Sequence, residues 1–98
     1  MRHYRLRGYR ILATNAWAGG YELDVVARRG RTLVFCEVKE KTGPGFDPVE
    51  MVGTEKQRRV RRAAETWLAA HPELGAIDVR FDVVAVHVGR LRRLADAF

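Results

Sequence analysis

Residues 21–41 of the 98-residue chain read YELDVVARRGRTLVFCEVKEK, and this stretch decides the fold. Residues of high strand propensity lie on both sides of Arg29 and Gly30, which form a short turn signal. We therefore predict a β-hairpin with strands at 22–28 and 32–39. Strands usually bury aliphatic side chains, so the charged residues of this hairpin need an explanation of their own. They are Glu22, Asp24, Glu37 and Lys39.

The rest of the chain extends the hairpin into an α/β domain with the order β-β-β-α-β-β. The helix has one apolar stripe from Val60 to Leu68, and Thr54 to Gln57 fits a capping box. We predict a single domain over residues 1–98, with a mixed β-sheet flanked by this helix. Its other elements are a strand at 8–15, a turn at 18–20, a loop at 42–53, the helix from Thr54 to His71-Pro72, a central strand at 79–88 and an edge strand at 91–95.

Composition limits the functional classes. The net charge of +6 favours polyanionic partners such as nucleic acid, although an arginine-rich composition alone also produces such a charge. Cys36 is the only cysteine, which excludes an intrachain disulfide, and its apolar neighbours predict a buried thiol. The lack of disulfides favours a reducing, cytoplasmic setting. No apolar run is long enough for a bilayer span, and the basic first ten residues do not form a signal peptide.

Strand alternation predicts where the charged side chains of the hairpin point. Val25, Ala27, Val34, Cys36 and Val38 should form a dry face, and the charged residues should share the other face with Val26, Leu33 and Phe35. A two-residue loop would place Glu22 opposite Glu37. A four-residue loop would place Asp24 opposite Glu37 and Glu22 opposite Lys39. Both registers gather all four charged groups on one face.

Three neighbouring carboxylates repel one another, so something positive must offset them. One interpretation is a solvated face on which Lys39 pairs with Glu22 or Glu37. Such a pair leaves the third acid unexplained. The other interpretation is a divalent-metal site, because carboxylate oxygens suit Mg²⁺ or Mn²⁺. A lysine two residues after Glu37 could then neutralise charge on a phosphate.

Asp24 followed by Glu37-Val38-Lys39 on the next strand resembles the PD-(D/E)xK nuclease superfamily. The match extends over almost the whole chain. The segments GGYELDVVARRGRTLVFCEVK, TEKQRRVRRAAETWL, RFDVVAV and ADAF resemble the YraN-like bacterial family, which is related to archaeal-type Holliday junction resolvases. This resemblance implies a restriction-endonuclease-like sheet.

The resemblance also implies roles for individual residues. Asp24 and Glu37 would bind Mg²⁺ or Mn²⁺, with the Val38 carbonyl as a further ligand, and Lys39 would act near the attacking water. Glu22 would support this site. Gln57 matches a family glutamine, but from the residues alone a cap and a site residue are equally good interpretations. Asp82 matches the family too, and we favour a buried, paired structural acid because an unpaired buried carboxylate is costly.

Two features depart from the family pattern. Leu23, not proline, precedes Asp24. The chain also starts close to its first strand, so the N-terminal helix of the family, with its glutamate, is expected to be missing. A missing helix would leave one sheet face open, which favours a homodimer or another partner as its cover.

These observations predict a metal-dependent endonuclease-like protein that binds DNA, including branched or flapped DNA, and hydrolyses phosphodiester bonds. DNA is favoured over RNA, and no membrane partner is expected. The alternative is a non-catalytic nucleic-acid-binding module that keeps the nuclease fold. In both cases a basic surface would follow backbone phosphates, although an ordinary solvated helix face would look the same. Its residues are Lys56, Arg58, Arg59, Arg61, Arg62 and Lys41, with Arg2, Arg5 and Arg7 as an extension.

Overall fold

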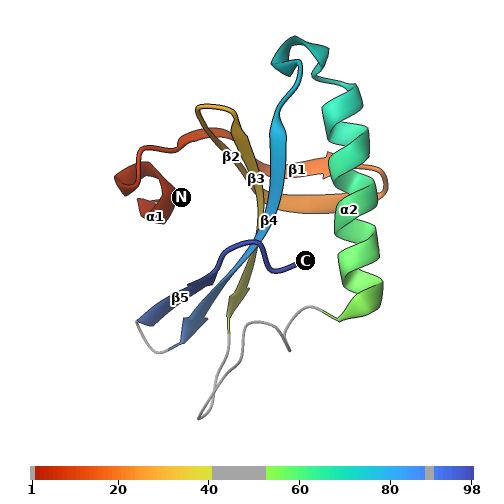
Figure 1. The fold of residues 1–98 in the computed structure, drawn as a ribbon. Helices are drawn as coiled ribbons and strands as arrows, with labels where there is room; N and C mark the ends of the chain where they lie inside the picture. The colour runs from red at the N-terminus through yellow and green to blue at the C-terminus, as the bar shows by residue number, and fades with distance from the viewer. Residues whose placement is uncertain (1, 41–52, 88–89) are drawn as a thin grey trace.

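A computed structural model describes residues 2–40, 53–87 and 90–98. They form one five-stranded mixed sheet with the strand order β1-β2-β3-β4-β5, with α2 on one face and the short α1 on the other (Figure 1). The predicted mixed sheet with a flanking helix is therefore confirmed. The elements are α1 (Arg2–Leu6), β1 (Arg10–Ala18), β2 (Tyr21–Arg29), β3 (Thr32–Glu40), α2 (Thr54–Ala69), the 3₁₀ turn η1 (Pro72–Leu74), β4 (Asp78–His87) and β5 (Arg90–Leu94).

The sheet consists of antiparallel pairs except at its centre. β1, β2 and β3 form a meander, β4 lies parallel to β3, and β5 returns antiparallel to β4. A parallel neighbour requires a long crossover, which here contains α2. The predicted loop at 42–53 belongs to this crossover and lies, apart from Gly53, outside the described residues.

Each face of the sheet has its own apolar core. The α2-side cluster contains Leu23, Val26, Leu33, Phe35 and Trp67, with Ala18, Val60, Ala63 and Ala64. The α1-side cluster contains Tyr4, Tyr9, Val25, Ala27, Val34, Cys36 and Val84, with Val38 packed against it. The predicted dry face of the hairpin is thus confirmed. Cys36 is buried as predicted, and burial raises the pKa of its thiol to about 12.

α2 buries the predicted stripe, but its first turn differs from the prediction. Val60, Ala63, Ala64 and Trp67 are buried against the sheet. The capping box is wrong: the N-cap is Gly53, and no side chain caps the helix there. Thr54 is already helical, so its hydroxyl is one position too late to act as the cap. No helix in the described part of the chain is long and apolar enough to cross a membrane.

A five-residue helix precedes the first strand, and it contains no glutamate. Residues 2–6 form α1, and Tyr4 of this helix is fully buried against the second face of the sheet. Tyr4 packs edge to face on Tyr9 with 5.2 Å between ring centroids. Because the α1-side cluster is buried, its residues give no support to a homodimer, which stays a prediction.

Candidate metal and nucleic-acid site

The hairpin register sets which charged residues meet. Val25 pairs with Cys36, and the ladder continues to Arg29 and Thr32 around the turn at residues 30–31. This is the register that we predicted for a four-residue loop. The loop itself is shorter, because Arg29 and Thr32 also pair. The paired positions end at Val25 and Cys36, and the Asp24 carboxylate beyond them lies near enough to Glu37 to raise its pKa.

Strand alternation breaks at Asp24. The β1–β2 ladder passes from Thr14–Val25 to Ala16–Leu23 and omits Asn15 and Asp24 between them. Asn15 has a left-handed backbone with φ of 50°, a conformation that asparagine tolerates better than most residues. Leu23 and Val26, three residues apart, consequently both face α2.

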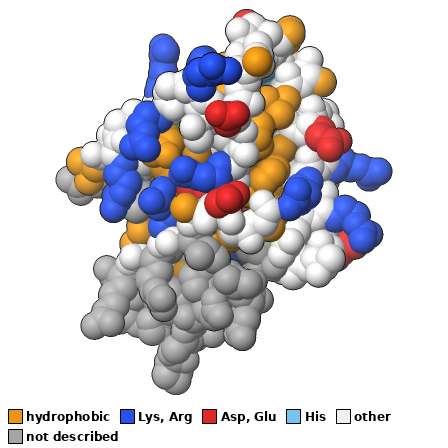
Figure 2. Space-filling model, in the orientation of Figure 1, with side chains coloured by type: hydrophobic (Ala, Val, Ile, Leu, Met, Phe, Trp, Pro, Cys, Tyr) orange, Lys and Arg blue, Asp and Glu red, His pale blue; other side chains and the backbone are white. Residues whose placement is uncertain are grey.

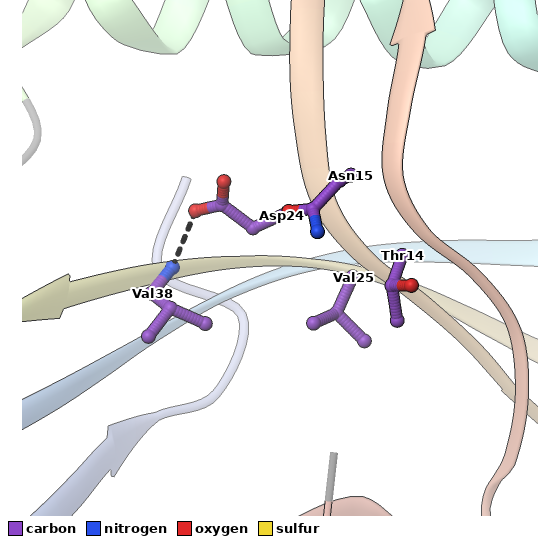
Figure 3. A pocket seen from close by; sticks show the side chains of 5 residues that line it. All are labelled: Thr14, Asn15, Asp24, Val25 and Val38. Carbon is purple, nitrogen blue, oxygen red and sulfur yellow. Dashed lines mark hydrogen bonds between the residues drawn. The ribbon is translucent and has the colours of Figure 1, made fainter.

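This break moves the carboxylates of β2 apart. Asp24 leaves the ladder, and its Oδ2 accepts a 2.8 Å hydrogen bond from the Val38 backbone N–H (Figure 3). Glu22, next to the buried Leu23, points to the face opposite α2 and is exposed. The prediction that all four charged groups share one face is therefore wrong for Glu22. In the described part of the chain, no three His, Cys, Asp or Glu side chains are grouped closely enough to hold a metal.

Glu37 is the buried acid of the site. Its side chain is 1% exposed and lies on the α2 side, where Oε1 accepts a 2.5 Å hydrogen bond from the Tyr21 hydroxyl. Oε2 is buried and has no hydrogen-bond partner among the described residues. Burial raises the pKa of Glu37 to about 7; the Tyr21 hydrogen bond opposes this shift, the Asp24 carboxylate adds to it, and the positive charge of Lys39 opposes it.

Lys39 and Val38 complete the local geometry. Lys39 follows Glu37 on the same face of β3 and is half-buried. In a strand, the N–H and C=O of one residue point toward the same neighbouring strand. Because the Val38 N–H is bonded to Asp24, the Val38 carbonyl also points toward the Asp24 side of β3.

This donor set fits a small divalent cation. Mg²⁺ typically binds through one or two carboxylates and keeps several waters, so it does not need three acidic side chains. Glu37 Oε2 is a buried acceptor without a partner, and an uncompensated buried carboxylate is unfavourable. A cation held by Glu37, Asp24 and the Val38 carbonyl would provide the missing compensation.

The raised pKa of Glu37 predicts how stability depends on pH. An acid whose folded-state pKa lies above its unfolded value contributes stability below about pH 4.5, and that contribution is lost as pH rises through about 7. In metal-free buffer, the loss from Glu37 should reach about 3 kcal/mol by pH 8. Urea unfolding of wild type and Glu37→Gln at pH 5.5 and 8 should show about 2 kcal/mol of this loss in wild type, because the rest occurs below pH 5.5, and the glutamine variant should not show it. Glu22→Gln, an exposed neighbour, should keep the wild-type dependence, and equal slopes for all three proteins would contradict the prediction.

A pocket of about 360 Å³ lies beside Asp24 (Figure 3). It is lined by Thr14, Asn15, Asp24, Val25 and Val38. Val25 and Val38 belong to the α1 side of the sheet, so the pocket opens on the face opposite α2. Asp24 therefore lies between two environments: the buried Glu37 on the α2 side and this pocket on the α1 side.

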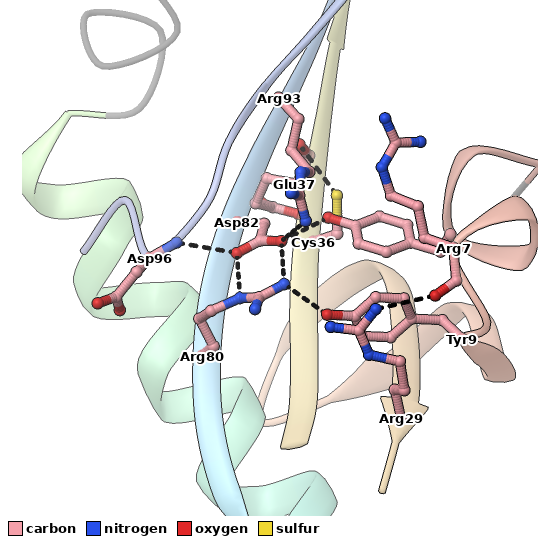
Figure 4. A network of polar contacts seen from close by, with 10 residues as sticks. Arg7, Tyr9, Arg29, Cys36, Glu37, Arg80, Asp82, Arg93 and Asp96 are labelled. Atoms are coloured by element: carbon pink, nitrogen blue, oxygen red, sulfur yellow. Dashed lines mark hydrogen bonds and ion pairs between the residues drawn. The ribbon is translucent and has the colours of Figure 1, made fainter.

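Asp82 has the structural role that we favoured. Its fully buried carboxylate accepts hydrogen bonds from the Tyr4 hydroxyl at 2.8 Å, from Arg80 at 2.8 and 2.9 Å, and from the Asp96 backbone N–H at 2.9 Å (Figure 4). Arg93 lies 3.6 Å away. The network joins α1, β4 and the segment after β5. Gln57 is half-buried in the first turn of α2.

The predicted basic surface is only partly available for phosphates. Arg58 and Arg59 both pair with Glu55 at 3.4 Å, and Arg61 lies over the rings of Phe81 and Phe98. Figure 2 shows Lys and Arg side chains spread over one face of the molecule, some of them over α2. Arg5 and Arg7 lie on α1, on the face of the sheet opposite α2, so they belong to a second basic surface and do not continue the one on α2 (Figure 1). Lys41 lies outside the described residues, whereas Lys56 and Arg62 are on α2.

Sequence reasoning missed two residues of the site. Tyr21 precedes the predicted strand, and nothing in its spacing indicates a hydrogen bond to Glu37. The predicted strand at 8–15 includes Asn15 as a regular residue, although asparagine is enriched at left-handed positions and is a signal for the break.

Comparison with known proteins assigns a family to this architecture. The family model described as "Uncharacterised protein family UPF0102" matches residues 1–86. A UPF0102 protein of Parafrankia sp. (strain EAN1pec) is 49% identical over 88% of this chain and 73% of its own length. One from Rhizobium johnstonii is 40% identical over 95% and 76%, and one from Geobacter metallireducens is 44% identical over 80% and 64%. The chain therefore belongs to the UPF0102 family.

Proposed function

We propose that this protein is a metal-dependent nuclease that hydrolyses phosphodiester bonds in nucleic acid, with DNA favoured over RNA. One observation carries the proposal: Glu37 is buried, Tyr21 holds one of its oxygens, and the other oxygen has no partner among the described residues. Asp24 lies beside it and Lys39 follows on the same strand face. The restriction-endonuclease-like arrangement suggested by the Asp24 and Glu37-Val38-Lys39 pattern is part of this proposal.

Each residue of the site has its own role in this proposal. Asp24, Glu37 and the Val38 carbonyl would hold Mg²⁺ or Mn²⁺, and such a cation, when bound, polarises a phosphate and lowers the pKa of a water. Tyr21 fixes the orientation of Glu37 by occupying Oε1. The Val38 N–H fixes Asp24 in the same way through Oδ2. Lys39 provides a positive charge that stabilises negative charge on the attacked phosphate.

The net charge of +6 supports a polyanionic substrate. Lys56 and Arg62 on α2 would contact phosphates, which give affinity without reading sequence, and Arg61 would do so only by leaving the rings of Phe81 and Phe98. Arg58 and Arg59 would break their ion pairs with Glu55 and bind phosphate instead. Such exposed ion pairs each stabilise the protein by only about 0–1 kcal/mol, so breaking them costs little free energy. The proposed setting is the cytoplasm.

A second candidate is a nucleic-acid-binding module without turnover. It is favoured by the absence of a third metal-ligating side chain near Asp24 and Glu37 in the part of the chain that the structure describes. Both candidates predict salt-sensitive binding, so binding alone does not separate them.

A cleavage assay separates the two candidates. Wild-type protein is incubated with labelled branched, flapped, duplex and single-stranded DNA in Mg²⁺, in Mn²⁺ and in EDTA. The proposal expects cutting of at least one substrate with a metal and none in EDTA. Binding of these substrates without cutting under any condition would establish the module instead. Metal-independent cutting would contradict the assigned roles of Asp24 and Glu37.

A further inference from the structure

Trp17 is the most exposed aromatic side chain that the structure describes. It is 72% exposed, whereas Trp67 is 7% exposed and stacks on His71. An indole is a large apolar group, and leaving it in water forgoes a substantial gain from burial. Its position in β1 explains the exposure: Ala16 and Ala18 pack toward α2, so Trp17 must point to the other face.

That face is the one on which the pocket beside Asp24 opens. Thr14 and Asn15, which line the pocket, precede Trp17 on the same strand. At the rise of a β-strand, three residues separate Trp17 from Thr14 by roughly 10 Å. The break at Asn15 is what brings Trp17 and Thr14 to the same face, because regular alternation would place them on opposite faces. Trp17 therefore lies on the face of the sheet onto which the pocket opens, further along β1 than the pocket residues Thr14 and Asn15.

The surroundings of Trp17 indicate which part of a nucleotide it would contact. Its cross-strand partner is the exposed Glu22, whose carboxylate would repel a phosphate placed directly on the indole. An uncharged aromatic base has no such penalty and can stack on the ring. Positive charge lies further away on the same face: Arg5 and Arg7 are exposed on α1, and Arg29 lies 4.6 Å over the Tyr9 ring.

From this arrangement we propose that Trp17 is a stacking platform for an unpaired base, and that the preferred substrates contain single-stranded nucleotides next to the scissile phosphate. The inference rests on the proposed function, because it names the substrate class of the same site. Bases within a duplex are already paired and stacked, so they cannot present a free face to Trp17. A single strand crossing the α1 side would place a base on Trp17, its backbone near Asp24 and later phosphates near the arginines of α1.

Fluorescence and affinity measurements in EDTA test the platform without cleavage. A short thymidine oligonucleotide should quench wild-type emission, because Trp17 is exposed and Trp67 is shielded. Trp17→Ala should bind the labelled oligonucleotide about tenfold more weakly, whereas Trp17→Phe should retain most of the affinity. Affinity for a duplex of equal length should be unchanged in both variants. Leu6→Ala removes another exposed apolar side chain, at 75% exposure, and should change neither affinity.

Three results would overturn the platform. They are an unchanged oligonucleotide affinity in Trp17→Ala, an equal loss for single strand and duplex, and a shift from dimer to monomer in sedimentation at unchanged affinity. The last result would identify the Trp17 surface as a contact between copies of this chain. Asp24→Asn should keep the quenching, so failure of the cleavage assay with quenching intact would reject only the nuclease proposal. Cleavage that persists at the wild-type rate in Trp17→Ala on flapped DNA would reject only the platform.

Discussion

Replacing Asp24 with asparagine is expected to lower metal-dependent cleavage at least about 100-fold, because changes one shell further from a metal already cost up to that factor. Asparagine keeps an oxygen that can accept the Val38 N–H bond, so the local backbone should stay in place. It removes the negative charge that would hold the cation. The measurements are initial rates with Mn²⁺ and the rise in melting temperature that Mn²⁺ produces, and both should fall in the variant.

Matched variants identify the cause of this loss. Glu22→Gln removes a charge two residues away on the exposed side of β2, and it should retain the wild-type rate and Mn²⁺ response. Lys39→Ala should lower the rate about 100- to 1,000-fold, as loss of a charge-stabilising group does, while Mn²⁺ still raises the melting temperature. A wild-type rate in Asp24→Asn would mean that the activity belongs to another site or to a contaminant.

Asp82→Ala is expected to destabilise the protein by about 3–5 kcal/mol, because it removes one partner of a buried ion pair. The carboxylate accepts from Tyr4, Arg80 and the Asp96 N–H, and Tyr4 is fully buried, so water cannot easily replace the carboxylate as the acceptor of its hydroxyl. Burial and the Asp82 charge both raise the pKa of Tyr4, so its hydroxyl stays a neutral donor that needs an acceptor. Native domains are stable by only about 5–15 kcal/mol, so this single change removes a large share.

Urea unfolding monitored by circular dichroism measures this effect. Asp82→Asn keeps one acceptor oxygen and should lose less stability than alanine, whereas Asp78→Ala, at an exposed position on the same strand, should change it by less than about 0.5 kcal/mol. The Tyr4 contact also implies that α1 loosens first, so amide exchange in residues 2–6 should accelerate in the Asp82 variants. A loss below about 1 kcal/mol in Asp82→Ala would contradict the structural role.

Local patterns account for much of this fold. Alternation separated the buried Val25, Ala27 and Val34 from the other face of the hairpin, and the apolar stripe from Val60 predicted the buried face of α2. The same patterns identified Asp82 as a buried, paired acid, because a lone carboxylate in an apolar strand must find donors. These outcomes follow from burial, which depends on which residues are apolar and on the period of their spacing.

The site depended on features that periodicity does not describe. Regular alternation would place Glu22, Asp24 and Glu37 on one face, and the break at Asn15 and Asp24 instead separates Glu22 from the buried acid. The hydrogen bond from Tyr21 to Glu37 joins residues 16 positions apart. The residues around Tyr21 and those around Glu37 therefore give no local sign of it.

The sequence by itself determined the mixed sheet, the buried face of α2 and the residues with charge in the hairpin, because each follows from local propensity and the spacing of apolar side chains. Only the tertiary structure decided which of these charges meet. It joined the Asp24 carboxylate to the Val38 N–H of the next strand and buried Glu37 on the α2 side with one oxygen unpartnered among the described residues. It also left Trp17 exposed on the face opposite α2. The physical reason is that an irregular position in a strand changes the facing of the residues beyond it, and here the irregularity involves two residues on neighbouring strands, Asn15 and Asp24.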